Sequence, residues 1–261
     1  MPGGVGYYGA FKYTLERGSL SPADGEPDKQ VFEVVLAYEN LSNKTVAADI
    51  PESGVKLDGD QSQQATGVSA DPSGDVAPGT KGIYTAKFDV GSSFEPSKVA
   101  IVLGDPNSVE APFIPLGSAA KRETRQARDE RVDATLAGIN GGATLTLDKA
   151  TLQYTYPDRN SQAAVGTVFV ALHGVFKGAT EDAVFYDYEF KLREPDGSVV
   201  PGTASFENGK RSGSIDLATG QTKDATILFV VNNNKKVVGA YEVQLPNKGG
   251  KGTVNASLML S

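Results

Sequence analysis

The sequence predicts an all-β protein made of two tandem β-sandwiches, and three observations support this fold class. The chain of 261 residues contains 30 glycines and 14 prolines, which favour the turns between many short strands. Several segments alternate apolar and polar residues, which is the period of a strand with one buried face. These segments also follow one another in the same order in the two halves of the chain, and the chain is long enough for two cores.

The first element is a strand that opens each half, and four further segments follow in the same order, at offsets between 132 and 142 residues that change where turn residues cluster. Within the second segment, Phe32, Val34 and Leu36 share one face, and Val168 and Val170 have the same parity in the other half. We interpret the pattern as a duplication; the alternative is a loose alignment of two unrelated β-rich stretches. The matched segments are 11–15 with 143–147, 31–38 with 167–174, 55–60 with 190–197, 86–90 with 227–231, and 99–103 with 241–245.

Residues 118–140 separate the two halves and differ from them in composition. Residues 121–133 are densely charged with both signs, and Val132, Leu136 and Ile139 follow at i, i+4 and i+7 spacing. This spacing predicts a short helix within a charged linker. The charges indicate either a basic patch for an acidic partner or a solvated helix, and the interleaved acidic residues favour the solvated helix.

Four short motifs in the first half resemble those of a known family: Asn40, Asp58-Gly59, Pro78-Gly79-Thr80 and Phe88-Asp89-Val90. They resemble the immunoglobulin-like sandwich of small bacterial exported proteins, the superfamily of immunoprotective extracellular proteins. The resemblance covers residues 9–117 well and residues 141–261 loosely, because Thr219-Gly220 replaces Pro-Gly and Phe229-Val230-Val231 replaces Phe-Asp-Val. It implies two tandem immunoglobulin-like β-sandwiches, at 9–117 and 141–261, that are extracytoplasmic, often lipid-anchored and not catalytic.

Composition excludes several classes of partner and chemistry. The net charge is −7, without the excess of positive charge that nucleic-acid binding needs. The chain has no cysteine, so disulfides and thiolate chemistry are excluded. No apolar run approaches the roughly 18 residues of a transmembrane segment. The first residues do not form a signal segment, so the chain is either cytoplasmic or the mature part of an exported protein. With the resemblance, we expect a secreted or cell-surface bacterial protein.

Few side chains of the sequence are candidates for catalysis or metal binding. The single histidine, His173, has the parity of the outer sheet surface, where it is either a general base or a bystander. No second histidine completes a zinc site, and no Gly-x-Ser-x-Gly elbow places a serine nucleophile. The Gly-rich segment 249–253 indicates a hairpin turn rather than a phosphate loop.

The carboxylates fall in predicted turns. Asp58 with Asp60, and Glu181 with Asp182, are either hydrolase-type pairs or caps of backbone amides. Asp58 and Asp60 with Asp71 or Asp75 are also a candidate calcium site, although the EF-hand spacing is absent. We expect no catalytic residue, no metal and no cofactor.

Tyrosines are the candidate binding residues. Tyr186, Tyr188 and Phe190 share one face of a predicted strand, and Tyr154 and Tyr156 form another same-face pair. Such a stripe is either inter-sheet core with its hydroxyls at the edge, or a surface that stacks sugars or anchors a protein. The absence of tryptophan disfavours carbohydrate. The candidate site is therefore Tyr154, Tyr156, Tyr186 and Tyr188.

The function that these observations favour is a non-enzymatic, extracytoplasmic binding or interaction module of a bacterial cell envelope. Its partner is then a protein or a cell-surface component, and the oligomeric state stays open. The alternatives are a structural component of a surface layer, adhesin or fibre, and a carboxylate-dependent hydrolase.

Overall fold

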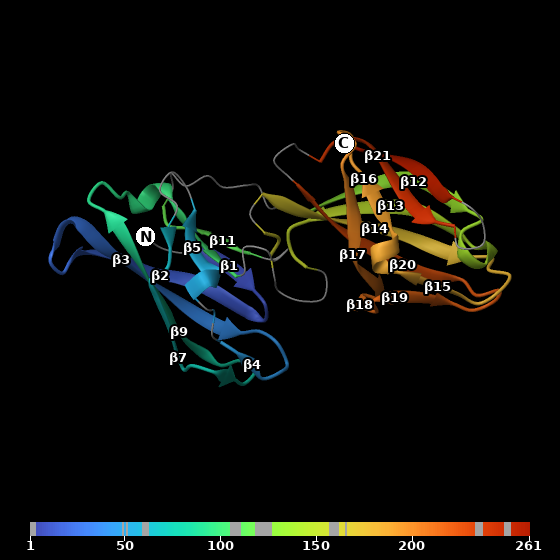
Figure 1. Ribbon diagram of the computed structural model, residues 1–261. Helices are drawn as coiled ribbons and strands as arrows, with labels where there is room; N and C mark the ends of the chain where they lie inside the picture. Colours follow the sequence, from blue (N-terminus) through green and yellow to red (C-terminus); the bar gives the residue numbers. More distant parts are fainter. Residues whose placement is uncertain are drawn as a thin grey trace. The chain divides into compact units, whose positions relative to one another are not determined.

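The computed structural model describes residues 4–48, 50, 52–58, 63–104, 111–117, 127–156, 162–164, 166–232, 237–247 and 252–261. These residues form antiparallel strands and short 3-10 turns, and they contain no α-helix. The all-β class is therefore confirmed (Figure 1). The chain divides into two compact units: unit 1 is Met1–Thr124 with Arg159–Val165, and unit 2 is Arg125–Asp158 with Gly166–Ser261. Within the described residues, no helix has the length and apolar character needed to cross a membrane.

Unit 1 is sandwich-like and contains two main sheets. Its core lies between them, since the buried faces of both sheets contribute to one apolar cluster. The five-stranded sheet has the order β1 (Val5–Tyr8), β2 (Phe11–Ala23), β3 (Glu26–Asn40), β9 (Lys81–Gly91) and β7 (Gly67–Asp71). The four-stranded sheet has the order β11 (Phe113–Pro115), β10 (Ala100–Leu103), β5 (Val55–Asp58) and β6 (Gln63–Gln64). The remaining elements are β4 (Val46–Ala47) paired with β8 (Asp75–Val76), and the turns η1 (Glu52–Gly54) and η2 (Pro96–Lys98).

Alternation along β3 produces the core of unit 1. Phe32, Val34 and Leu36 are fully buried, as the two-residue period predicted. At the end of the strand, the buried side chain of Asn40 donates to the carbonyls of Lys44 (2.9 Å) and Val76 (3.0 Å). Asn40 therefore fixes the chain where it leaves β3, and its polar atoms are satisfied despite their burial.

Unit 2 is built around a long, folded-over sheet. Its first part has the order β12 (Arg128–Ala137), β13 (Thr144–Gln153), β14 (Thr167–Lys177), β20 (Lys223–Asn232) and β17 (Val199–Glu207). It continues through β17 to β16 (Lys191–Arg193), β21 (Gly239–Pro246) and β22 (Thr253–Leu260). The other elements are β18 (Lys210–Arg211) beside β17, β15 (Ala183–Tyr186) paired with β19 (Ser214–Leu217), and the turns η3 (Asn140–Gly142) and η4 (Asp187–Glu189).

Strand β17 allows the sheet of unit 2 to fold over its own core. Its residues 199–201 pair with β16, and residues from Gly202 onward pair with β20. At the change of partner, the Gly202 amide donates to the Phe190 carbonyl (2.8 Å), and a Cβ on Gly202 would lie 2.2 Å from the Asp187 carbonyl oxygen. Only glycine permits this approach. The two end strands, β12 and β22, consequently lie close together.

The linker helix expected around Val132, Leu136 and Ile139 is absent. Residues 128–137 instead form β12, in which Val132, Ala134 and Leu136 are buried and the residues between them are exposed. Valine and leucine four residues apart fit both a helix and a strand, and the small Ala134 concealed the two-residue period. Pairing with β13 and burial of the face with Val132, Ala134 and Leu136 stabilise the strand over the helix. The charged residues 118–126 lie outside the described residues.

The strand orders of the two units correspond. The order β1-β2-β3-β9-β7 of unit 1 has the counterpart β12-β13-β14-β20-β17 in unit 2, and β11-β10-β5-β6 has the counterpart β22-β21-β16-β17. The small pair β4-β8 has the counterpart β15-β19. The five pairs of segments matched in the sequence lie on β2 and β13, β3 and β14, β5 and β16, β9 and β20, and β10 and β21.

Candidate functional site

An exposed pair of tyrosines lies at the end of β15. Along this strand Phe185 is buried, while Val184 and Tyr186 face outward. The chain then turns through η4, which carries Tyr188. The rings of Tyr186 and Tyr188 are stacked, with centroids 5.4 Å apart and planes inclined by 13°. The two residues are 40% and 61% exposed, so the pair presents a large aromatic surface to solvent.

Two carboxylates hold the turn that carries these rings. The Tyr188 amide donates to Asp187 Oδ1 (2.7 Å), and the Tyr186 amide donates to Glu189 Oε2 (3.0 Å). On the neighbouring strand, exposed Asp216 lies opposite Val184. We call Val184, Tyr186 and Tyr188 the tyrosine platform. Carboxylates border it, and the backbone around it is fixed by hydrogen bonds.

The platform contains two of the four tyrosines proposed from the sequence. Tyr156 is buried, where its ring packs edge-on against Phe169 with centroids 5.3 Å apart. Tyr154 is partly buried and packs against the core of unit 2. Strand β13 ends at Gln153, so these two residues do not share a strand face as expected. Phe190 also departs from the expected stripe, because η4 turns the chain and directs this side chain into the core.

A second polar arrangement crosses the outer face of the long sheet. Four side chains from neighbouring strands form one chain of hydrogen bonds, from Asp129 on β12 to Thr226 on β20. The Thr151 hydroxyl donates to Asp129 Oδ1 (2.6 Å) and lies 2.9 Å from His173 Nε2. The Thr226 hydroxyl lies 2.9 Å from His173 Nδ1. The sequence assigned His173 to this outer face, but the threonines that engage its ring belong to other strands, and only strand register brings them together.

The hydrogen-bond chain determines the form of the imidazole. Thr151 gives its only hydroxyl proton to the Asp129 carboxylate, so its oxygen can only accept from His173 Nε2. In the neutral ring Nε2 then carries the proton, and Nδ1 accepts from the Thr226 hydroxyl. The Thr151 hydrogen bond also holds the pKa of Asp129 below its ordinary value.

Burial and charge favour this neutral ring. Partial burial lowers the pKa of His173, and the ammonium of Lys149 lowers it further, whereas Asp129 and Asp148 act in the opposite direction. Lys149 Nζ lies 3.6 Å from Asp129 Oδ2. His173 is therefore a neutral, fully hydrogen-bonded side chain with no lone pair directed at a substrate.

His173 also forms part of an open depression of about 440 Å³ on the outer face of this sheet. The turn between β17 and β18 forms one side of it, where Asn208 adopts a positive φ of 49°. The lining residues are Asp148, Lys149, His173, Gly174, Val175, Phe206, Asn208, Gly209, Asp224, Ala225 and Thr226.

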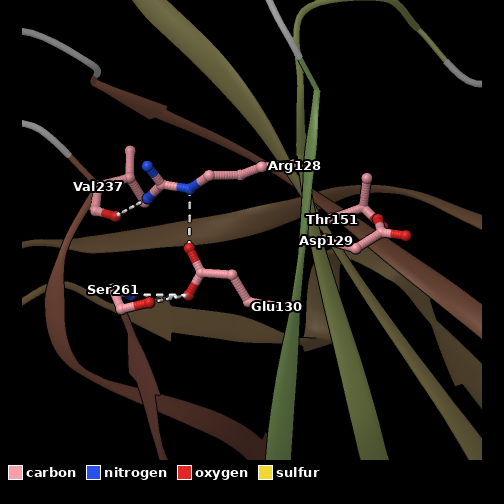
Figure 2. Close-up of polar contacts among 6 residues, drawn as sticks. All are labelled: Arg128, Asp129, Glu130, Thr151, Val237 and Ser261. Carbon is pink, nitrogen blue, oxygen red and sulfur yellow. Dashed lines mark hydrogen bonds and ion pairs between the residues drawn. The ribbon is translucent and has the colours of Figure 1, made fainter.

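Figure 2 shows β12 with polar contacts on both of its faces. Asp129 and Thr151 lie on one side, at the end of the histidine row. On the other side Glu130 accepts from Arg128 Nε (2.8 Å) and from the Ser261 amide (2.6 Å), and Arg128 donates to the Val237 carbonyl (2.9 Å). This Glu130 cluster links β12 to the residue that follows β22.

The acidic residues proposed from the sequence as a hydrolase pair or calcium site do not form a metal site among the described residues. Asp182 accepts from the amide (2.8 Å) and hydroxyl (3.1 Å) of Thr219, so it caps a turn. Asp60 lies outside the described residues, as do residues 249–251 of the Gly-rich segment. Among the residues that the structure describes, no three histidine, aspartate or glutamate side chains gather in a way that could hold a metal.

In comparisons with known proteins, no family model, no curated protein and no solved structure matches the chain.

Proposed function

We propose that this protein is a non-enzymatic binding module of a bacterial cell envelope, built from two immunoglobulin-like sandwiches that arose by duplication, and that its tyrosine platform contacts a protein partner. The observation that carries the binding role is the exposed, stacked pair Tyr186 and Tyr188. An extracytoplasmic location follows from the family resemblance of the first half.

The strand order supports the immunoglobulin-like part of this proposal. Such domains place strands A, B, E and D in one sheet and C, F and G in the other. In unit 1, the order β2-β3-β9-β7 fits A-B-E-D, and β5, β10 and β11 fit C, F and G. In unit 2 the same positions are taken by β13-β14-β20-β17 and by β16, β21 and β22. One shared order in both units is what a duplication would produce.

The chemistry of the platform supports a protein partner with a basic side chain. Tyrosine is enriched where interfaces concentrate their binding energy, because it offers a large, rigid contact area at low entropic cost. The neighbouring carboxylates of Asp187, Glu189 and Asp216 complement a cation. An arginine can stack on a tyrosine ring and pair with a carboxylate at the same time. We therefore expect the partner to present an arginine or lysine to the platform.

The state of His173 supports the non-enzymatic part. A general base must offer a lone pair to the proton that it abstracts. Nδ1 of His173 already accepts from Thr226, and Nε2 donates to Thr151. The ring is thus committed to the sheet rather than to a substrate.

Cross-linking from the platform tests this proposal. A photoreactive phenylalanine analogue at position 184 should capture a protein from bacterial envelope fractions, while the same analogue at Asp24, in the β2–β3 turn of unit 1, should not. The purified partner should then bind the wild-type protein and the Y186F/Y188F variant alike. The Y186A/Y188A variant should bind at least about 10-fold more weakly, since aromatic hot spots contribute about 2 kcal/mol or more.

Equal binding by the Y186A/Y188A variant would refute a role for the platform. Concentration-dependent assembly of the pure protein into fibres or arrays, seen by light scattering, would instead support a structural component of a surface layer.

A further inference from the structure

The depression beside His173 has the volume of a small-molecule site, and its lining carries more carboxylates than ammonium groups. Its volume of about 440 Å³ lies within the range of about 300–1,000 Å³ that is typical of small-molecule sites. Side chains that point away from the core form its floor, because His173, Thr226 and Phe206 occupy one row across β14, β20 and β17. Their backbones belong to a paired sheet, so this floor is rigid.

Negative charge dominates the lining. The carboxylates of Asp148 and Asp224 are exposed, and neither forms an ion pair with another of the described residues. The cation in the lining, Lys149, lies 3.6 Å from the carboxylate of Asp129 and is partly neutralised by it. Arg211 lies opposite Phe206 on β18 but does not line the depression. With His173 neutral, the two carboxylates outnumber the one ammonium, so the lining keeps a formal net negative charge.

We propose that this depression binds a small organic cation with a primary ammonium group, which Asp148 and Asp224 hold. An ammonium offers three donors to carboxylate oxygens. A calcium ion would need about 6–8 oxygen ligands, more than two carboxylates and a threonine hydroxyl supply here. None of the residues that line the depression belongs to the tyrosine platform, and the proposal does not depend on the platform's role.

His173 makes the binding of such a cation sensitive to pH. A second proton on the imidazole would place a positive charge in the floor of the depression, where it would oppose the ammonium. The charged groups around the ring are Asp129, Asp148 and Lys149 from β12 and β13, and Asp224 from β20. Cation and proton therefore compete, and by linkage each weakens the binding of the other by the same factor.

The single histidine of the chain makes the test direct. Its ring gives one Hε1 resonance in a proton NMR spectrum, and this resonance reports on the floor of the depression. We expect 1,4-diaminobutane, added at constant ionic strength at pH 7.5, to shift the resonance saturably. The pKa of His173 should fall further when the diamine is saturating, and the affinity should decrease as the pH is lowered through the titration of the ring. Nα-acetyl-lysine amide is titrated in parallel. Tighter binding of the diamine would indicate a free amine as the ligand, and tighter binding of the lysine derivative would indicate a lysine side chain.

The variant D148N/D224N should weaken binding of either probe at least 10-fold, while the control D24N, in the β2–β3 turn, should leave it unchanged. Both variants change exposed side chains, and unchanged chemical-shift dispersion elsewhere in the spectrum verifies their fold. The proposal is overturned if neither probe produces a saturable shift, or if D148N/D224N binds as tightly as the wild type.

Discussion

At the residue scale, the polar side chains of unit 2 contribute unequally to stability, according to how far each is removed from water. Glu130 is the clearest case, because its side chain is 9% exposed and it accepts hydrogen bonds from both Arg128 and Ser261. Most other ion pairs of the described residues join side chains that are 30–73% exposed, such as Glu26 with Lys29. Such exposed pairs contribute little.

Replacement of Glu130 by alanine should therefore destabilise unit 2. The change leaves the Ser261 amide and Nε of Arg128 without their acceptor. We expect the free energy of unfolding to fall by about 2 kcal/mol, the usual value for a charge-assisted hydrogen bond. The control Glu26→Ala removes an exposed pair and should cost less than about 0.5 kcal/mol. Chemical denaturation of both variants measures the difference. Equal losses would mean that the Glu130 cluster has no special role.

The pH dependence of stability should report on His173. Its pKa is lowered in the folded protein, chiefly by burial, from the value of 6.5 expected in the unfolded chain. The unfolded chain therefore binds the proton more readily. Consequently, the stability contributed by the neutral ring is complete above pH 6.5 and is lost as the pH falls through that value toward the folded pKa.

We expect the free energy of unfolding to fall more steeply between pH 8 and pH 5 in the wild type than in His173→Gln, which has no titrating ring. Denaturant titrations at several pH values provide both curves. Parallel curves for the two proteins would contradict a lowered pKa. The carboxylates titrate in both proteins, so their effect cancels in the comparison.

At the scale of elements, strands with a long, regular alternation could be predicted from the sequence. The β3 and β14 segments carry apolar residues at alternate positions over most of their length, and both are interior strands of a sheet. The segment around Val132 and Leu136 could not be assigned from its own pattern, since its apolar spacing fits both periods. Its strand conformation depends on the pairing of β12 with β13, which is a tertiary contact.

The residues of the two candidate sites also differ in how far local sequence determines them. The alternation of β15 placed Tyr186 and Phe185 on opposite faces but left open which face was buried, and the stacking of Tyr186 on Tyr188 depends on the turn η4, which the sequence did not indicate. The partners of His173 come from strands that are distant in sequence. Their meeting depends on register, which no local pattern contains.

A matched pair of substitutions in β12 tests its assignment as a strand. Leu136 is fully buried and its neighbour Thr135 is exposed, as in a strand with one buried face. We expect Leu136→Ala to lower the free energy of unfolding by about 3 kcal/mol, because it removes buried methyl groups and leaves a cavity. Thr135→Ala should change it by less than about 0.5 kcal/mol. Similar costs at both positions in thermal or chemical unfolding would contradict a one-sided strand.

At the scale of the whole molecule, the described residues form two separate apolar cores. One core collects residues between Phe11 and Leu116, the other collects residues between Val132 and Leu260, and no residue belongs to both. Because each core is packed within its own unit, local stability should be set separately in the two units.

Val34 and Val170 provide a matched test, since they occupy corresponding positions on β3 and β14 and both are fully buried. Each Val→Ala change removes the same buried atoms and should cost about 2 kcal/mol in its own unit. Hydrogen exchange followed by mass spectrometry resolves the units by their peptides. Val34→Ala should accelerate exchange in β2, β3 and β9 and leave β13, β14 and β20 unchanged, whereas Val170→Ala should do the reverse. Faster exchange in both units after either change would mean that the two cores unfold as one cooperative structure.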